Sequence, residues 1–213
     1  IARAIEADIE TIIAASTGNA GAAMACMAAS VGKKAVIIAP RSAPPAKVAQ
    51  LLTFDAKVVL VDGTYDQAFD LSIEASDELG WYNRNTGYNP YTVEGKKTAG
   101  LEIWEQVLLN RNQFDQNMTV FIPVGDGNIL SGVAKGFADL LAVGWIERLP
   151  RLVGVQAEGS AAIFNAFTAG KDVIEPVSAK TVADSISVDL PRDGLRALKR
   201  VKQSGGYFLT VSD

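Results

Sequence analysis

Two glycine-containing runs carry the residue types that bind anions in proteins. Residues 16–21 (STGNAG) follow the apolar run TIIAA, and residues 125–132 (GDGNILSG) follow the apolar run TVFIPV. A strand that turns into a helix leaves the N–H groups of the first helical turn without an intrahelical acceptor, and the helix dipole adds partial positive charge there. Both runs are therefore candidate sites for a carboxylate or a phosphate.

The first run adds polar side chains to those N–H groups. The hydroxyls of Ser16 and Thr17 can donate hydrogen bonds, and the amide of Asn19 can donate and accept. An N-cap followed by a tight turn uses the same residue types. From the residues alone, an anion site and a simple helix start are equally good interpretations.

In the second run, Gly125 and Gly127 allow successive N–H groups to converge on one anion. Asp126 would repel that anion, so we expect its side chain to point away and to accept a hydrogen bond from a neighbouring backbone N–H. The dinucleotide fingerprint G-x-G-x-x-G is absent, because Leu130 stands at the third glycine position. A plain tight turn and a nucleotide site remain alternatives.

Other candidate residues have simpler interpretations. The chain contains no histidine, which excludes a histidine base and a Cys/His metal cluster within it. Cys26 lies among alanines and is expected to be a small core residue. Lys96 and Lys97 have the chemistry of a Schiff-base lysine, but their polar flanks predict solvated side chains at a helix start. We expect no metal site and interpret the acidic residues near the C-terminus as caps and surface charges: Asp184, Asp189 and Asp193.

The composition narrows the classes of partner. The net charge of −4 gives no reason to expect nucleic acid or an anionic membrane surface as a partner. No apolar run reaches the roughly 18 residues that span a bilayer. The single cysteine cannot form an internal disulfide, which is compatible with a reducing compartment. We therefore expect a cytoplasmic protein.

Short apolar runs must form the strands that position the two loops. They are rich in Val and Ile and do not alternate with polar residues, which is typical of strands buried on both faces of a parallel sheet. Helical stretches between them give repeated β-α units and an α/β fold. The predicted strands are residues 11–16, 35–39, 57–61, 119–124 and 152–156.

Helices and boundaries follow from composition. Residues 18–31 are alanine-rich and apolar nearly all round, which predicts a helix buried on every side. Pro44 and Pro45 are typical of a first helical turn, and residues 64–79 have an amphipathic pattern. The turn-rich run 82–90 (YNRNTGYNP) is the predicted domain boundary.

Together these motifs resemble the fold-type-II pyridoxal-phosphate (PLP) enzymes, the tryptophan synthase β-like family that includes threonine synthase and threonine dehydratase. Residues 16–19 are similar to the family's Ser-x-Gly-Asn loop, and residues 125–128 match the loop that cradles the cofactor phosphate. Three further runs look like the threonine synthase subgroup: 89–98 (NPYTVEGKKT), 102–106 (EIWEQ) and 152–159 (LVGVQAEG).

The resemblance implies roles for individual residues. Asn19 would contact the 3′-oxygen of PLP, and a valine at Gly127 would block the cofactor phosphate while leaving the apoprotein folded. Ala20 departs from the Thr or His that is common after the motif's Asn. The implied substrate-binding residues are Ser16, Thr17, Asn19 and Ala20, and the implied cofactor-binding residues are Asn19, Gly125, Asp126, Gly127, Asn128 and Ile129.

The resemblance also implies a two-domain, three-layer α/β sandwich with parallel sheets and with PLP in the cleft between the domains. Residues 1–88 would form most of the smaller domain with the substrate-carboxylate loop, and residues 89–213 part of the larger domain with the PLP-phosphate loop. The Schiff-base lysine would precede Ile1, and the partner of the pyridine nitrogen would follow Asp213. We therefore expect this chain to be part of a longer protein and to be inactive alone.

The implied activity is that of a threonine synthase-like lyase, which converts O-phosphohomoserine into threonine and phosphate. A threonine or serine dehydratase on the same fold is the main alternative. A catalytically inactive domain that binds an anion or a protein partner is another. The expected ligand is a small amino-acid substrate, and a homodimer is expected by analogy with relatives.

Overall fold

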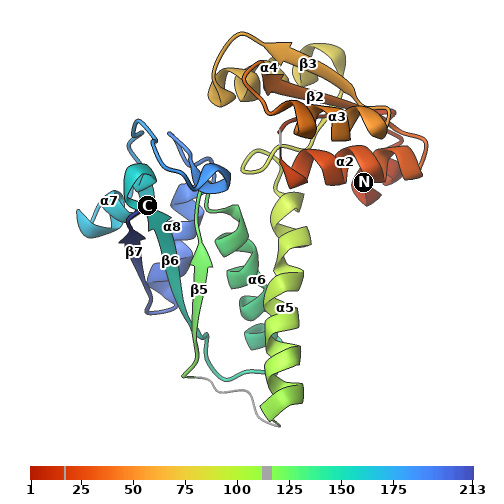
Figure 1. The fold of residues 1–213 in the computed structure, drawn as a ribbon. Helices are drawn as coiled ribbons and strands as arrows, with labels where there is room; N and C mark the ends of the chain where they lie inside the picture. Colours follow the sequence, from red (N-terminus) through yellow and green to blue (C-terminus); the bar gives the residue numbers. More distant parts are fainter. Residues whose placement is uncertain (17, 112–116) are drawn as a thin grey trace. The chain divides into compact units, whose positions relative to one another are not determined.

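The computed structural model describes residues 1–16, 18–111 and 117–213, with only the backbone described at 108–111. The chain divides into two compact units, Ile1–Asn85 (unit 1) and Thr86–Asp213 (unit 2), whereas the resemblance implies a division after Tyr88. Each unit has its own parallel sheet, accompanied by helices (Figure 1).

Unit 1 contains a four-stranded parallel sheet of order β3-β2-β1-β4. In its register, Ile13 of β1 pairs with Val36 of β2 and with Asn83 of β4. The elements are α1 (Ala2–Glu6), β1 (Thr11–Ala15), α2 (Asn19–Ser30), β2 (Lys34–Pro40), α3 (Pro45–Thr53), β3 (Lys57–Val61), α4 (Tyr65–Leu79) and β4 (Tyr82–Asn83).

Strand β1 shows why unit 1 has three layers. Ile12 packs in a buried cluster with Met24 of α2, whereas Ile13 packs in a different cluster with Phe69 of α4. Successive strand residues point to opposite faces of a sheet. Helices therefore cover both faces of the sheet, and β1 is buried along almost its whole length.

Helix α2 is buried on one side only. Cys26 is exposed, and Met27 has 49% of its surface exposed. The predictions that this helix is buried on every side and that Cys26 is a core residue are therefore wrong. Alanine is the strongest helix former, so its high content here reflects helix propensity more than burial. The buried residues of α2 are Gly21, Met24, Ala25 and Ala28.

Unit 2 contains a three-stranded parallel sheet of order β5-β6-β7. One hydrophobic cluster joins the sheet to its helices and includes Ile122 of β5, Leu130 of α6 and Leu198 of α8. The elements are α5 (Tyr91–Arg111), β5 (Thr119–Pro123), α6 (Asn128–Ala142), β6 (Arg151–Ala157), the 3-10 helices η1 (Glu158–Ser160) and η2 (Asp184–Ile186), α7 (Ala162–Thr168), α8 (Gly194–Gln203) and β7 (Tyr207–Val211).

The predicted strands all form, but those at sheet edges are less buried than expected. Strands β1, β2 and β6 lie inside their sheets and are mostly buried. Strands β3 and β5 are edge strands, and Val59 and Phe121 are 44% and 58% exposed. The prediction that every strand is buried on both faces is therefore wrong for these two strands.

Glycines bring α5 and α6 into close contact, and the two helices run side by side (Figure 1). A Cβ atom placed at Gly100 of α5 would lie 2.6 Å from the carbonyl oxygen of Val133. A Cβ placed at Gly132 of α6 would lie 2.5 Å from the Cβ of Lys96. These contacts leave no room for a side chain at either glycine. They fix the start of α5 against the start of α6.

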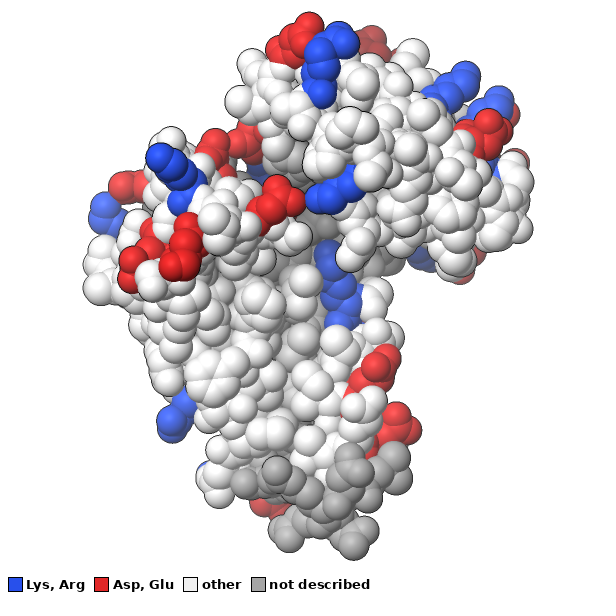
Figure 2. Space-filling model, in the orientation of Figure 1, with Lys and Arg blue, Asp and Glu red and all other residues white. Residues whose placement is uncertain are grey.

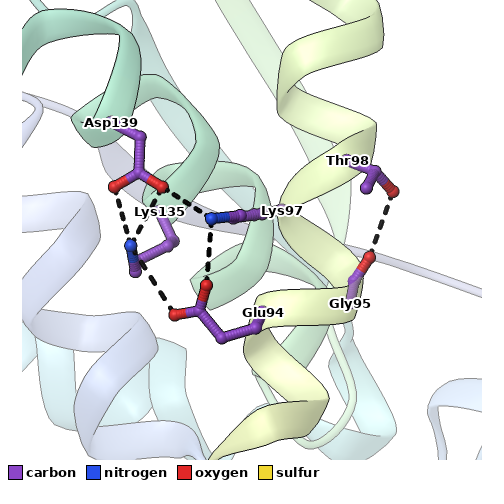
Figure 3. A network of polar contacts seen from close by, with 6 residues as sticks. All are labelled: Glu94, Gly95, Lys97, Thr98, Lys135 and Asp139. Carbon is purple, nitrogen blue, oxygen red and sulfur yellow. Dashed lines mark hydrogen bonds and ion pairs between the residues drawn. The ribbon is translucent and has the colours of Figure 1, made fainter. Parts of the chain in front are cut away.

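Four charged side chains add a polar network between the same helices (Figure 3). The ammonium nitrogen of Lys97 lies 3.0 Å from a carboxylate oxygen of Glu94 and 3.0 Å from one of Asp139, and Lys135 lies 2.7 Å from Asp139. The hydrogen bond from Lys97 lowers the pKa of Glu94. Burial opposes ionisation of Asp139, but hydrogen bonds from Lys135 and Lys97 outweigh it and lower its pKa. Hydrogen bonds to Glu94 and Asp139 raise the pKa of Lys97, so the prediction that Lys97 is simply solvated is wrong.

This network predicts a pH-dependent contribution to stability. Carboxylates with lowered pKa values stabilise the fold above about pH 4, and this contribution is lost as the pH falls through their folded pKa values. The raised pKa of Lys97 gives a contribution that is present below about pH 10 and lost above its folded pKa. Since the groups are partly exposed, Lys97→Met should lower the melting temperature of the full-length protein by about 1–4 °C at pH 7. Thermal unfolding should show a smaller difference at pH 3 and in high salt. An equal difference at both pH values would assign the effect to the apolar stem of Lys97.

The surface carries charges of both signs. On the face drawn in Figure 2, the Lys and Arg side chains of the described residues are interspersed with those of Asp and Glu. Within the described ranges, none of the helices has the length and apolar character needed to cross a membrane.

Candidate functional site

The loop after β1 uses Ser16 as a hydrogen-bond acceptor. Ser16 Oγ accepts the N–H of Gly21 in the first turn of α2, at 3.0 Å. A Cβ at Gly21 would lie 2.8 Å from the carbonyl oxygen of Ser16, so glycine is needed where the helix folds back over the loop. The Ser16 hydroxyl hydrogen can still donate. The contact fits the helix-start interpretation and leaves a donor for an anion.

Two of the other residues predicted to bind substrate in this loop are exposed to solvent. Asn19 is the first residue of α2 and is exposed, as is Ala20. Among the residues that the structure describes, no hydrogen-bonding partner of the Asn19 side chain is found. Thr17 lies outside the described residues. Within the described residues, the Asn19 side chain is thus left available to bind a ligand.

A buried amide network holds the start of this loop. The N–H of Ala15, the last residue of β1, donates to Asn85 Oδ1 at 2.7 Å. The Asn85 side chain donates in turn to Ser72 Oγ of α4, and its backbone N–H donates to Asn83 Oδ1. Asn83 Nδ2 donates to the carbonyl of Ser72 at 3.0 Å. Because buried polar groups are costly to leave unpaired, this network fixes where β1 ends. No periodic pattern in the sequence predicts this network.

The side chain of Asp126, in the loop after β5, is bonded to another segment of unit 2. Asp126 Oδ1 accepts the backbone N–H of Arg192 at 3.1 Å, and the Asp126 carbonyl accepts the N–H of Asp193 at 3.0 Å. The prediction that this carboxylate bonds a neighbouring N–H is confirmed. Asp126 therefore ties the loop to the segment that precedes α8.

Both glycines of this loop are packed against other parts of unit 2. Gly127 has a φ of 89°, and a Cβ there would lie 2.8 Å from the Cβ of Ala197 in α8. A Cβ at Gly125 would lie 3.0 Å from the Cα of Ile186. Because the side chain would approach Ala197 of α8 so closely, we expect Gly127→Val to destabilise the apoprotein as well as to block the phosphate.

The first turn of α6 offers several donors. Helix α6 begins at Asn128 after the N-cap Gly127 and has no side-chain cap. The N–H groups of Asn128, Ile129 and Leu130 therefore lack an intrahelical acceptor. The hydroxyl of Ser131 is fully buried and has no hydrogen-bonding partner within the described part of the chain. This set of donors can bind an anion.

Lys96 lies beside this turn, which the sequence did not indicate. Its ammonium nitrogen donates to Asn128 Oδ1 at 2.5 Å and to Thr86 Oγ1 at 3.3 Å. The prediction that Lys96 is a solvated side chain is therefore wrong. The interval of 32 residues between Lys96 and Asn128 contains most of α5 and all of β5, so no local pattern could reveal the contact.

Two of the acidic residues near the C-terminus bond within unit 2, and the prediction of a cap or surface charge is wrong for Asp193, which is buried and makes no side-chain cap bond. Asp189 Oδ1 accepts the N–H of Ala179 at 2.7 Å. Asp193 precedes α8, is 5% exposed and accepts a hydrogen bond from Asn128 Nδ2 at 3.3 Å. Within the described ranges, no three Cys, Asp or Glu side chains are grouped as metal ligands would be.

Known proteins match the chain along its whole length. The sequence model of the family described as "Pyridoxal-phosphate dependent enzyme" matches residues 1–213. The threonine synthase of Methanocaldococcus jannaschii is 35% identical over 215 aligned residues, which cover 100% of this chain and 52% of the relative. That of Methanosarcina acetivorans is 34% identical with the same coverage. The chain thus spans about half the length of the curated relatives it matches.

Solved structures give the same fold. The processed form of threonine deaminase isoform 2 from Solanum lycopersicum matches with a TM-score of 0.76 and 25% identity, over 94% of this chain and 52% of that one. Maize serine racemase matches with a TM-score of 0.75 and 26% identity, over 98% and 58%. The expected fold class, α/β with parallel sheets as in the fold-type-II PLP enzymes, is confirmed.

Proposed function

The chain belongs to the pyridoxal-phosphate-dependent enzyme family, whose cofactor is PLP, and we propose that it serves a threonine synthase-type reaction. This reaction converts O-phosphohomoserine into threonine and phosphate. The observation that supports this choice is the match of the whole chain to threonine synthases at 34–35% identity. PLP, when bound, supplies an electron sink for the substrate carbanion. The chain's own residues supply binding and orientation.

The loop Gly125–Ile129 is the proposed phosphate site of unit 2. The N–H groups of the first turn of α6 and the unpartnered hydroxyl of Ser131 form a donor set that fits a phosphate. The carboxylate of Asp126 is oriented by the N–H of Arg192, but it keeps its negative charge, which the donors around the loop must offset when a phosphate binds. Hydrogen bonds to a charged group contribute about 1.5–3 kcal/mol each. The described residues therefore suit the cofactor of the family.

The loop after β1 is the proposed substrate site of unit 1. The Ser16 hydroxyl retains a donor after accepting the N–H of Gly21, and the first turn of α2 adds N–H groups that favour a carboxylate. Asn19 is exposed at that turn. We assign Ser16, Thr17, Asn19 and Ala20 to the substrate carboxylate, with Asn19 also contacting the cofactor ring.

The lysine that holds PLP covalently is proposed to lie outside residues 1–213. Several lysines of this chain are paired with carboxylates: Lys34 with Glu10, Lys171 with Glu175, and Lys202 with Asp172. These lysines lie at the surface, whereas a lysine that forms a Schiff base needs a desolvated site. We therefore expect residues 1–213 alone to be inactive, with low and scattered labelling when borohydride is added with PLP. One stoichiometric adduct with turnover would contradict this assignment.

Threonine or serine dehydratase activity is the second candidate, and the structural match to threonine deaminase favours it. Fold alone does not separate reactions on one scaffold. A cytoplasmic location, expected from the single cysteine, and a homodimer, expected by analogy with relatives, are also part of the proposal. Fractionation and sedimentation would test them.

A substrate panel tests the proposed reaction. With the full-length protein and PLP, we expect phosphate release and threonine formation from O-phosphohomoserine, at a kcat/KM at least about 100-fold above that for oxoacid formation from threonine or serine. Oxoacid formation without phosphate release would assign a dehydratase. Cofactor binding without turnover of any of the three compounds would favour a binding domain.

A further inference from the structure

Lys96 is held in place by the packing of α5 on α6. The Cβ of Lys96 lies only 2.5 Å from the position that a Cβ on Gly132 would occupy. One turn along, a Cβ at Gly136 would lie 2.5 Å from the carbonyl oxygen of Lys97. The two backbones therefore approach so closely that Lys96 cannot move away from the start of α6 without separating the helices.

Asn128 is bound on both sides of its amide by charged residues. Its Oδ1 accepts from the ammonium group of Lys96, and its Nδ2 donates to Asp193 at 3.3 Å. Asn128 is 2% exposed and is the first residue of α6. A cation on the oxygen and an anion on the nitrogen fix the orientation of this amide. The first turn of α6 is thereby anchored through Asn128.

The surroundings of this turn contain negative charge. Asp193 is nearly buried and forms an ion pair with Arg196 at 3.2 Å, while Asp126 lies within the loop itself. A phosphate carries about −1.5 to −2 charges at pH 7 and would be repelled by these carboxylates. An ammonium group in hydrogen-bonding contact with Asn128 counters that repulsion.

We propose that Lys96 is a positioning residue for the cofactor phosphate, which fixes Asn128 in the first turn of α6 and supplies positive charge to the loop Gly125–Ile129. The proposal rests on the placement of the phosphate at this loop, which belongs to the proposed function. It assigns to Lys96 neither the covalent bond to the cofactor nor a proton transfer.

The test compares the affinity of the full-length apoprotein for PLP and for pyridoxal, which lacks the phosphate. Lys96→Gln keeps a hydrogen-bond donor and removes the charge, and we expect it to raise the Kd for PLP by about 10- to 100-fold. The Kd for pyridoxal should stay within about twofold. Lys96→Arg should retain most of the affinity, because it retains the charge.

Lys97→Met is the matched control, since Lys97 is the adjacent lysine of α5 but contacts Glu94 and Asp139. It should lower the melting temperature and leave the Kd for PLP unchanged. Equal losses of PLP and pyridoxal affinity in Lys96→Gln would overturn the proposal, because they would show a general defect of the fold. A reduced PLP adduct on Lys96 would also overturn it.

A second variant separates this proposal from the placement of the phosphate. Ile129 is 51% exposed in the first turn of α6, where a glutamate is tolerated by the helix dipole but would repel a bound phosphate. If Ile129→Glu raises the Kd for PLP and Lys96→Gln does not, the role of Lys96 is wrong and the loop assignment stands. If neither variant changes the Kd for PLP, the phosphate lies elsewhere and both assignments fail.

Discussion

Asn19→Ala is expected to lower kcat by on the order of 100-fold or more while leaving the fold unchanged. The kcat should fall because Asn19 is assigned to orient the substrate and the cofactor ring. The fold should not change because Asn19 is exposed at the first residue of α2 and its amide has no hydrogen-bonding partner among the described residues. Alanine is a better helix former than asparagine, so the substitution should not weaken α2. Steady-state kinetics and thermal unfolding of the full-length protein would measure the two effects.

Asn165→Ala is the matched control for this prediction. Asn165 is an exposed asparagine of α7 in unit 2 and is assigned no role in binding. We expect it to change neither kcat nor the melting temperature. If Asn19→Ala retained the turnover of the wild type, Asn19 would be a turn residue only, and the assignment of the β1 loop to the substrate would be wrong.

Gly127→Val should abolish PLP retention and also destabilise unit 2. A left-handed backbone costs a residue with a Cβ about 1–2 kcal/mol, and Gly127 has a φ of 89°. Overpacking adds about 1–3 kcal/mol, because the new side chain would collide with Ala197 and the backbone of Asp193. Cofactor absorbance after gel filtration and thermal unfolding of the apoprotein would measure both losses.

The variant Gly144→Val separates the cost of the left-handed backbone from the cost of overpacking against α8. Gly144 also has a positive φ, 76°, but a Cβ there would meet no atom within 4 Å. This control should show the backbone cost alone and keep PLP bound. A Gly127→Val protein that unfolds at the same temperature as Gly144→Val would show that α8 accommodates the side chain, contrary to the packing described above.

Much of the fold follows from the sequence because its signals are local. Buried parallel strands leave Val- and Ile-rich runs, and each predicted run forms a strand. The helix predicted over residues 64–79 forms as α4, which begins with a capping box between Thr64 and Gln67. Strand β4 contains two residues, too few for any periodic signal. The exposed side of α2 escaped prediction because alanine fits buried and exposed helix positions equally well.

The candidate site could be predicted only where its residues are consecutive. The runs that contain Ser16–Gly21 and Gly125–Asn128 stand out because a strand, a glycine turn and a helix follow one another. Lys96 and Asn85 reach the loops through tertiary packing, Lys96 through the glycine contacts between α5 and α6 and Asn85 through the pairing of β4 with β1. Such contacts join residues far apart in the chain, so spacing alone does not reveal them.

The most direct test is a crystal structure of the full-length protein with PLP bound. The proposed phosphate site predicts that the cofactor phosphate lies within about 3 Å of the N–H groups of residues 125–130, at the usual hydrogen-bond distance, with Lys96 bonded to Asn128 or to the phosphate. A PLP phosphate bound at a different element, with the Gly125–Ile129 loop contacting only α8 and its preceding segment, would contradict it.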